Sequence, residues 1–448
     1  MAEGSAYKKH GTETRDQERE GEDASLPAGL SQVLGPSGLA PFRVRAFRLQ
    51  WPADLLTSCA FEMETLILGW YVLVETRSVL LLTVFGALQY TGTLIAPLLG
   101  VAGDRIGHRN LLCCMRAIYA TLAATLMILA FAGAVTPALV LVIAALMGLV
   151  RPSDLGVRLA LVADNVPREQ LVAALGISRT TSDCARIGGA LTGAGMFAAF
   201  GMGPAYAAVA GCYAVGLALT LAIGSKTAAR GAEVLAAGTA RPSAWGDLRE
   251  GVTYAWTSPP LQVAMLLAFL VNLTAYPLSN GLLPYVAKEV YLLDQTGLGY
   301  LVASFSLGAL LGSVAVSMRG GLMPGRMMLV FAGVWYSMLV VFAQMRVPAA
   351  AVVMLMLAGF AQSFCMVLLM VLLLRNTDEK LRGRVMGVRM LAIYSLPLGL
   401  LASGVLIERV GYHTTATLYA VAGLLFTGLI ALKWRADLWR ADMPANAR

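Results

Sequence analysis

Charged residues are scarce in this chain: of its 448 residues only 13% are Asp, Glu, Lys or Arg, whereas 58% are hydrophobic. An ordinary soluble protein carries about a quarter charged residues, so the composition excludes a soluble globular domain. One bilayer crossing takes about 20 apolar residues, and long apolar runs follow Phe47. We therefore predict a polytopic membrane protein. The net charge of +8 requires no nucleic-acid partner, because the basic residues gather in loops.

Motifs that carry catalytic chemistry are also missing. The sequence has no nucleotide-binding loop, nucleophile elbow, H-E-x-x-H or C-x-x-C motif, and its three histidines (His10, His108 and His413) lie far apart. Its six cysteines lie in or beside apolar runs without paired spacing, which favours small packing residues over disulfides or metal ligands. We expect no enzyme activity, no metal site and no cofactor.

The apolar runs predict an all-α membrane protein with twelve transmembrane helices. The predicted spans are 47–74, 79–102, 110–133, 137–163, 169–200, 203–224, 261–286, 297–317, 327–346, 349–375, 385–409 and 413–433. They form two six-helix bundles, at 45–224 and 261–433, joined by a cytoplasmic linker at 225–260.

The segments outside the bundles are polar. Residues 1–44 lack the apolar core and cleavage site of a signal peptide, and their composition predicts a disordered cytoplasmic tail. A second cytoplasmic tail is expected at 434–448. Within the linker, Trp245–Trp256 has the pattern of a short interfacial amphipathic helix. Lysine and arginine are concentrated in the loops on the linker's side, which predicts that both termini are cytoplasmic.

An internal repeat supports two equivalent halves. A shift of 211 residues superimposes five pairs of identical residues: Gly148 on Gly359, Asn165 on Asn376, Gly176 on Gly387, Gly188 on Gly399, and Gly193 on Gly404. The offset spans six helices, an even number, so the halves are predicted to be parallel repeats. Parallel halves are typical of alternating-access transporters whose substrate site lies between them near the midplane.

Three ionisable residues lie in the span 47–74. They are Asp54, Glu62 and Glu64. A charge at membrane depth costs about 2.5–3.5 kcal/mol on insertion scales, so each is expected to be paired or to line a polar cavity. At 100° per residue Glu62 and Glu64 point about 160° apart, which predicts separate environments. Each is either a proton-coupling carboxyl, as exchange with protons needs, or a structural ion-pair partner.

Two further charge ladders follow. They are Arg151, Asp154 and Arg158 in the span 137–163, and Arg179, Asp183 and Arg186 in the span 169–200. Each places its charges on one helix face, where Asp154 can pair with either arginine. One interpretation is that the two ladders face and pair with each other and only stabilise the packing of their helices. The other interpretation is functional: the arginines attract an anion, or the ladders release an arginine when a carboxyl of the span 47–74 is protonated. Asp154 and Asp183 are then further proton-coupling candidates.

The second half has almost no charge within its spans. Asn272, Asn280, Gln362 and Tyr394 are therefore its candidate substrate-cavity residues, beside the arginines 151, 179 and 186. Polar residues of this kind also serve as hydrogen-bonding contacts between packed helices.

A short charged loop between the second and third spans carries the sequence G-V-A-G-D-R-I-G-H-R. Its defining residues are Gly100, Asp104, Arg105, Gly107 and Arg109. Glycines permit a tight turn and close helix approach, while a loop that only obeyed the positive-inside rule would need the charges but not this spacing.

These residues resemble the major facilitator superfamily, in particular the branch of the enterobactin exporter and related transmembrane secretion effectors. The loop is similar to that superfamily's signature between helices 2 and 3. Three further stretches resemble motifs of the branch: Ser58–Glu62 with Trp70, Asp183–Gly193 with Gly189 in place of a proline, and Leu381–Gly387.

The resemblance implies two helical bundles, rocker-switch alternating access and secondary-active export of a small molecule by a monomer in the bacterial inner membrane. It also implies gating contacts from Asp104 to the start of the span 385–409 near Gly387, with Arg158 as the partnering cation. We expect a siderophore-like or drug-like amphipathic substrate exchanged for protons at Glu62 or a neighbouring carboxyl. The alternatives are an importer or lysolipid flippase of the same fold, or a non-transporting membrane sensor.

Overall fold

The computed structural model describes residues 39–224, 244–319, 323–378 and 381–442, and their regular structure is entirely helical. Most of the predicted N-terminal tail, at 1–38, lies outside these ranges. The first half contains η1 (Ala40–Arg43), α3 (Arg45–Thr76), α4 (Val79–Leu88), η2 (Thr91–Leu94), α5 (Ala96–Ile106), α6 (His108–Phe131), α7 (Pro137–Asn165), η3 (Arg168–Gln170), α8 (Leu171–Phe200) and α9 (Met202–Leu221).

The second half follows α11 (Ala244–Thr257), the helix found where the linker sequence predicts one. Its elements are α12 (Pro259–Leu270), η4 (Val271–Ala275), η5 (Pro277–Gly281), α13 (Leu283–Tyr285), η6 (Val286–Val290), α14 (Gln295–Met318), α15 (Pro324–Gln344), α16 (Pro348–Arg375), α17 (Arg382–Ile393), α18 (Ser395–Val410), α19 (Tyr412–Lys433) and α20 (Arg435–Ala441). The short helix α20 lies within the predicted C-terminal tail.

All twelve predicted spans fall on helical segments. Nine of the segments in the described ranges are long and apolar enough to cross a membrane. The others are α3 and α8, which carry the predicted buried charges, and the span 79–102, which is interrupted at η2.

Three predicted spans are not regular α-helices along their whole length. The span 79–102 divides around Gly92, and the span 385–409 divides at Tyr394 because Pro397 has no N–H to donate to the Ile393 carbonyl. The span 261–286 passes into the wide turns of the π-helical segments η4, η5 and η6 and continues to Val290. Such turns are rare and gather at functional sites.

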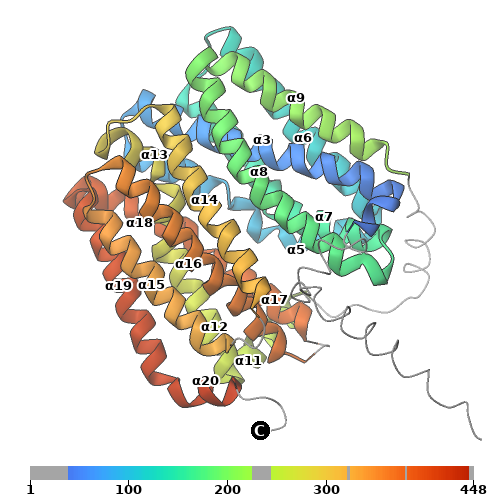
Figure 1. The fold of residues 1–448 in the computed structure, drawn as a ribbon. Helices are drawn as coiled ribbons and strands as arrows, with labels where there is room; N and C mark the ends of the chain where they lie inside the picture. The colour runs from blue at the N-terminus through green and yellow to red at the C-terminus, as the bar shows by residue number, and fades with distance from the viewer. Residues whose placement is uncertain (1–38, 225–243, 320–322, 379–380, 443–448) are drawn as a thin grey trace, which may run out of the picture.

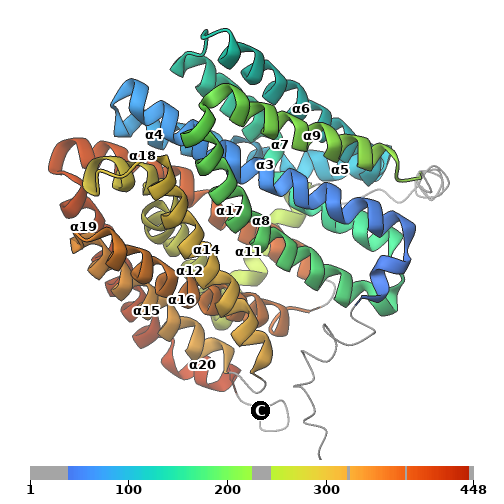
Figure 2. The same ribbon diagram turned by 45° about the horizontal axis from the view of Figure 1, so that its top comes forward.

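The two halves come together at one end and spread apart toward the other (Figure 1). We call the end that holds α11, α20 and the start of α3 the linker end, and the opposite end the distal end. At the distal end α14 packs along α8, as the turned view in Figure 2 also shows, and α18 packs against α4. Ser78 donates a hydrogen bond to Glu408 there, and Lys288 lies 5.8 Å from the ring centroid of Trp70.

One pair of glycines from the repeat has the same packing role in both halves. A Cβ on Gly148 of α7 would overlap the Leu88 carbonyl oxygen of α4, and a Cβ on Gly359 of α16 would overlap the Phe305 carbonyl oxygen of α14. The fourth helix of each half thus approaches the second helix backbone to backbone. This equivalence agrees with the predicted offset of 211 residues.

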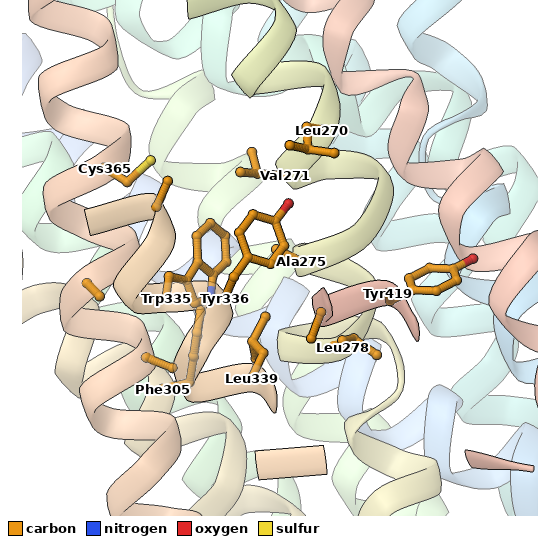
Figure 3. Close-up of a cluster of buried hydrophobic side chains, with 14 of the residues drawn as sticks. Leu270, Val271, Ala275, Leu278, Phe305, Trp335, Tyr336, Leu339, Cys365 and Tyr419 are labelled. Atoms are coloured by element: carbon orange, nitrogen blue, oxygen red, sulfur yellow. The ribbon is translucent and has the colours of Figure 1, made fainter. Parts of the chain in front are cut away.

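The core of the second half is aromatic and aliphatic (Figure 3). Trp335 and Tyr336 of α15 are fully buried against the irregular segment η4 and against Cys365 of α16. The Tyr336 hydroxyl lies 2.7 Å from Thr274 Oγ1, so the ring spans the junction between α15 and η4. Apolar packing therefore fixes the position of this interrupted helix.

Candidate functional site

A buried group of charges, here called the Asp54 cluster, joins α3, α6 and α7. Asp54 forms an ion pair with Arg116 of α6, whose side chain is fully buried. Arg158 of α7 places its Nε 3.8 Å from Asp54 Oδ1 and also pairs with Asp154, one turn earlier. Gln50 donates a hydrogen bond to the Arg158 carbonyl at 3.0 Å. Two carboxylates and two arginines balance one another inside one half, which is the condition for tolerating buried charge.

Arg151, at the other end of the ladder on α7, has neutral partners. It donates hydrogen bonds to the side chains of Gln89, at the end of α4, and of Thr65 on α3, the latter at 2.9 Å. Its guanidinium carbon lies 4.6 Å from the ring centroid of Phe61. The predicted ladder is therefore divided, with Asp154 paired to Arg158.

Glu64 occupies a separate setting between α3 and α9. Its carboxylate accepts hydrogen bonds from Tyr213 at 3.0 Å and Tyr206 at 3.3 Å, and the residue is only 3% exposed. Glu64 and Arg151 line the same small cavity. A carboxyl held by hydroxyl donors rather than by a direct cation can change its charge without leaving an arginine unpaired.

Glu62 faces a different neighbour, so the predicted separation of the two glutamates is confirmed. Arg186 of α8 places its Nε 3.4 Å from Glu62 Oε1, and the two side chains are 43% and 25% exposed. Gly189 of α8 leaves space for α3: a Cβ there would lie 2.9 Å from Glu62 Cβ. The glycine that replaces the expected proline thus permits the close approach of α8 to α3.

The rest of the ladder on α8 is an ion pair between an exposed arginine and a buried aspartate. Arg179 lies 3.4 Å from Asp183, with the arginine side chain 67% exposed and the aspartate 8%. Among the described residues, no ion pair joins the ladder on α8 to the ladder on α7.

The polar candidates of the second half are mostly held by local contacts. Asn272 donates to a backbone carbonyl of its own helix at 2.8 Å, and Gln362 donates to the hydroxyl of Tyr276 at 2.8 Å. Asn280 is exposed in η5, and Tyr394 marks the break between α17 and α18. Gln362 and Tyr276 together form a polar contact between α16 and the irregular segment that follows α12.

The second half also contains a charge that the sequence analysis overlooked. Arg389 lies in α17, half-buried, within electrostatic range of Tyr276 and of Arg179 in the other half. The expectation of an almost uncharged second half is therefore wrong at this position. Arg186 is likewise within electrostatic range of Tyr276. Arginines from both halves thus approach the same tyrosine.

The charged loop between α5 and α6 turns at Gly107, whose φ of +87° explains the glycine. Arg109 donates to the Leu221 carbonyl at the end of α9, at 2.5 Å, whereas Arg105 is exposed. His108 Nδ1 lies 2.7 Å from Asp164 Oδ2, which ties the loop to the end of α7.

The predicted gating contacts remain predictions. The side chain of Asp104 lies outside the described residues. Among the described residues, no heavy atom comes within 4 Å of a Cβ placed on Gly100 or on Gly387. Arg158, the proposed cation, is held in the Asp54 cluster.

Several residues of these networks were missed. Arg116 and Arg389 are single arginines inside apolar runs, a signal as readable as the one that identified Arg151. Arg116 also donates to the Gly216 carbonyl at 3.2 Å, so it links α6 to α9 as well as to α3. Tyr206 and Tyr213 could not be identified from the sequence, because tyrosine is common in apolar spans and does not by itself indicate a polar site.

Comparison with known proteins gives one family and one fold. A sequence profile described as "Transmembrane secretion effector" matches residues 36–448. No curated protein matches this sequence.

Three similar solved structures illustrate the fold. The nucleoside transporter NupG has 13% identity and a TM-score of 0.65, over 87% of this chain and 99% of that chain. A POT family transporter in complex with 5-aminolevulinic acid has 14% identity and a TM-score of 0.66, over 88% and 97%. The human organic anion transporter MFSD10 (TETRAN) has 16% identity and a TM-score of 0.59, over 86% and 99%. At these identities the likeness establishes the major facilitator fold alone.

Proposed function

The chain belongs to the transmembrane secretion effector family of the major facilitator superfamily, and on this premise we propose that it exports a small amphipathic molecule in exchange for protons. The molecule is siderophore-like or drug-like, and transport proceeds by alternating access between the two halves. We place the linker end on the cytoplasmic side of the bacterial inner membrane, following the distribution of basic residues.

The observation that carries the proposal is the ion pair between Glu62 and Arg186. This pair joins α3 to α8 and is partly exposed, whereas the Asp54 cluster is buried. A proton on Glu62 would remove the carboxylate's attraction and free Arg186 to bind an acidic group of the substrate. Loss of the proton would restore the pair and displace that group. Competition of this kind couples two ligands through one site, as exchange requires.

The arginines between the halves favour a substrate with negative charge. Arg179 and Arg186 of α8 lie in electrostatic range of Tyr276 or Arg389 in the second half. Each of these arginines has a carboxylate partner, Asp183 for Arg179 and Glu62 for Arg186, so an anionic group of the substrate would bind them in competition with these carboxylates. An acidic siderophore or an acidic amphipathic drug has the chemistry to satisfy them, with its apolar part against neighbouring aliphatic side chains.

The test is proton flux in everted membrane vesicles energised to an inside-acid gradient. Catecholate and hydroxamate siderophores, dyes and lysophospholipids would be added in turn, and collapse of the gradient recorded. We expect one class to collapse the gradient in the wild type and not in Glu62→Gln. Glu75→Gln is the matched control, because Glu75 lies on the same helix but is exposed at the distal end.

Each outcome separates the alternatives. A substrate that enters vesicles without moving protons would overturn proton exchange and leave the charges of the first half a structural role. Net movement of substrate out of the vesicles would identify an importer, and lysophospholipid as the active class would identify a flippase. Unchanged proton-coupled transport in Glu62→Gln would overturn the proposal.

A further inference from the structure

A groove lies on the outer surface of the second half, between α15, α19 and α20 at the linker end. Its volume is about 510 Å³, within the range of small-molecule sites. It is bordered by Val330 and Leu432, which are 61% and 75% exposed. Large apolar side chains on the exterior of a membrane-spanning helix face lipid tails. The groove is therefore a feature of the lipid-facing surface and is separate from the charges between the halves.

Two glycines keep the groove open along its length. Gly333 of α15 and Gly428 of α19 both line it, and in the described part of the chain no heavy atom lies within 4 Å of a Cβ placed on Gly428. The lining of α19 extends from Leu424 to Leu432, which at 1.5 Å per residue is about 12 Å. This length accommodates the first part of one extended hydrocarbon chain.

The mouth of the groove at the linker end is basic and aromatic. Arg326, in the first turn of α15, stacks on Trp439 of α20 with its guanidinium carbon 3.8 Å from the ring centroid. Arg435 lies over the same ring at 4.9 Å. Tryptophan and arginine at the end of a transmembrane helix mark the level of the lipid head groups. Two guanidinium groups are thus held on one ring at this level.

Asp442 is the acidic residue that contacts Arg326, and its carboxylate also accepts hydrogen bonds from backbone donors. The Asp442 side chain is 2% exposed and accepts hydrogen bonds from the backbone N–H groups of Gly325 at 2.8 Å and Arg326 at 3.1 Å. Its carboxylate lies 3.7 Å from Arg326 Nε. The Nη groups of Arg326 make no hydrogen bond within the described ranges and remain available at the groove mouth.

We propose that this groove binds an anionic phospholipid of the leaflet at the linker end. The phosphate lies between Arg326 and Arg435, and one acyl chain lies along Gly333 and Gly428. Arginine is suited to phosphate because its planar fork offers paired donors, and a basic pocket above an apolar groove matches the two parts of such a lipid. The proposal does not depend on the direction, substrate or coupling of transport.

The test uses the purified full chain in a neutral detergent. Thermal unfolding and native mass spectrometry would be recorded with phosphatidylglycerol, with phosphatidylcholine as the zwitterionic lipid, and with glycerol 3-phosphate as the head group alone. Arg435→Gln removes one cation and Gly428→Leu fills the groove. Arg409→Gln and Gly211→Leu are the matched controls, because Arg409 is exposed at the distal end and Gly211 is exposed with open space around it. Arg326 is left intact because it contacts Asp442.

We expect phosphatidylglycerol to be retained and to raise the unfolding temperature, and phosphatidylcholine to do so less. Arg435→Gln should weaken this binding about fivefold, the effect of about one basic residue at a membrane surface. Gly428→Leu should abolish it, while both controls bind as the wild type does. Equal binding of the two lipids, an effect of glycerol 3-phosphate equal to that of the lipid, or normal binding by both groove variants would overturn the proposal.

Discussion

The two halves share one architecture but are held together by different interactions. The first half contains the Asp54 cluster, in which Asp54, Arg116 and Arg158 join three helices by charge. The second half instead packs Trp335 and Tyr336 against an irregular helix. Buried charge is costly to take out of water, so a buried ion pair is by itself weak evidence for stability. The first half is thus held together by ion pairs between its helices, and the second half mainly by aromatic and aliphatic packing.

The largest expected effect comes from removing one partner of the Asp54 cluster. Arg116→Met leaves Asp54 buried beside a single arginine, and breaking a buried pair in this way costs about 3–5 kcal/mol. We expect little folded protein to be recovered, as measured by the yield of monodisperse protein and by thermal unfolding in detergent. The double variant Arg116→Met with Asp54→Leu should recover much of the loss, and a single variant as stable as the wild type would contradict the assignment.

A second effect should be equal in the two halves. Gly148→Ala and Gly359→Ala each place a methyl group against a backbone carbonyl, and overpacking of this kind costs about 1–3 kcal/mol. Thermal unfolding should show similar losses for both, since the contacts are equivalent. Gly211→Ala and Gly428→Ala, in open space, should change little. A loss in one half only would mean that the repeat does not extend to this packing.

A third effect, the difference of about 1 kcal/mol between two variants, distinguishes charged from neutral hydrogen-bond acceptors. Tyr213→Phe removes a donor to the Glu64 carboxylate and Tyr336→Phe removes a contact with the Thr274 hydroxyl. A bond to a charged group contributes about 1.5–3 kcal/mol and a neutral one about 1 kcal/mol. Unfolding of the two variants should therefore differ in that order. Equal losses would indicate that Glu64 is neutral in the folded protein.

The smallest effect on stability is expected at Arg389. It has no ion-pair partner in the described part of the chain, so Arg389→Gln should change the free energy of unfolding by less than about 0.5 kcal/mol. Transport of an acidic substrate should nevertheless fall, measured as uptake into everted vesicles. A neutral substrate transported in parallel is the control, and an equal fall for both would assign Arg389 to structure.

The fold could be predicted because hydrophobic runs, basic loops and the repeat can all be read directly from the order of residues in the chain. The twelve spans, the linker helix and the separate surroundings of Glu62 and Glu64 follow from helical geometry. What could not be predicted is which groups meet across helices. Arg151 could bind Asp154, but Gln89 and Thr65 reach it instead, and nothing in the spacing of α7 indicates this. The role of Tyr206 and Tyr213 as hydrogen-bond donors to Glu64 depends on the packing of α9 against α3, which the sequence does not reveal.

The wide turns of η4 to η6 change how this helix would respond to labelling. From Tyr276 onward the less buried positions include Asn280, Tyr285 and Glu289, which are four or five residues apart. A cysteine-accessibility scan interpreted at 3.6 residues per turn would see the reactive stripe drift around the helix and would assign its two ends to different surfaces. Reagent access along residues 271–290 should instead repeat at a longer interval, so that one continuous stripe accounts for all the labelled positions.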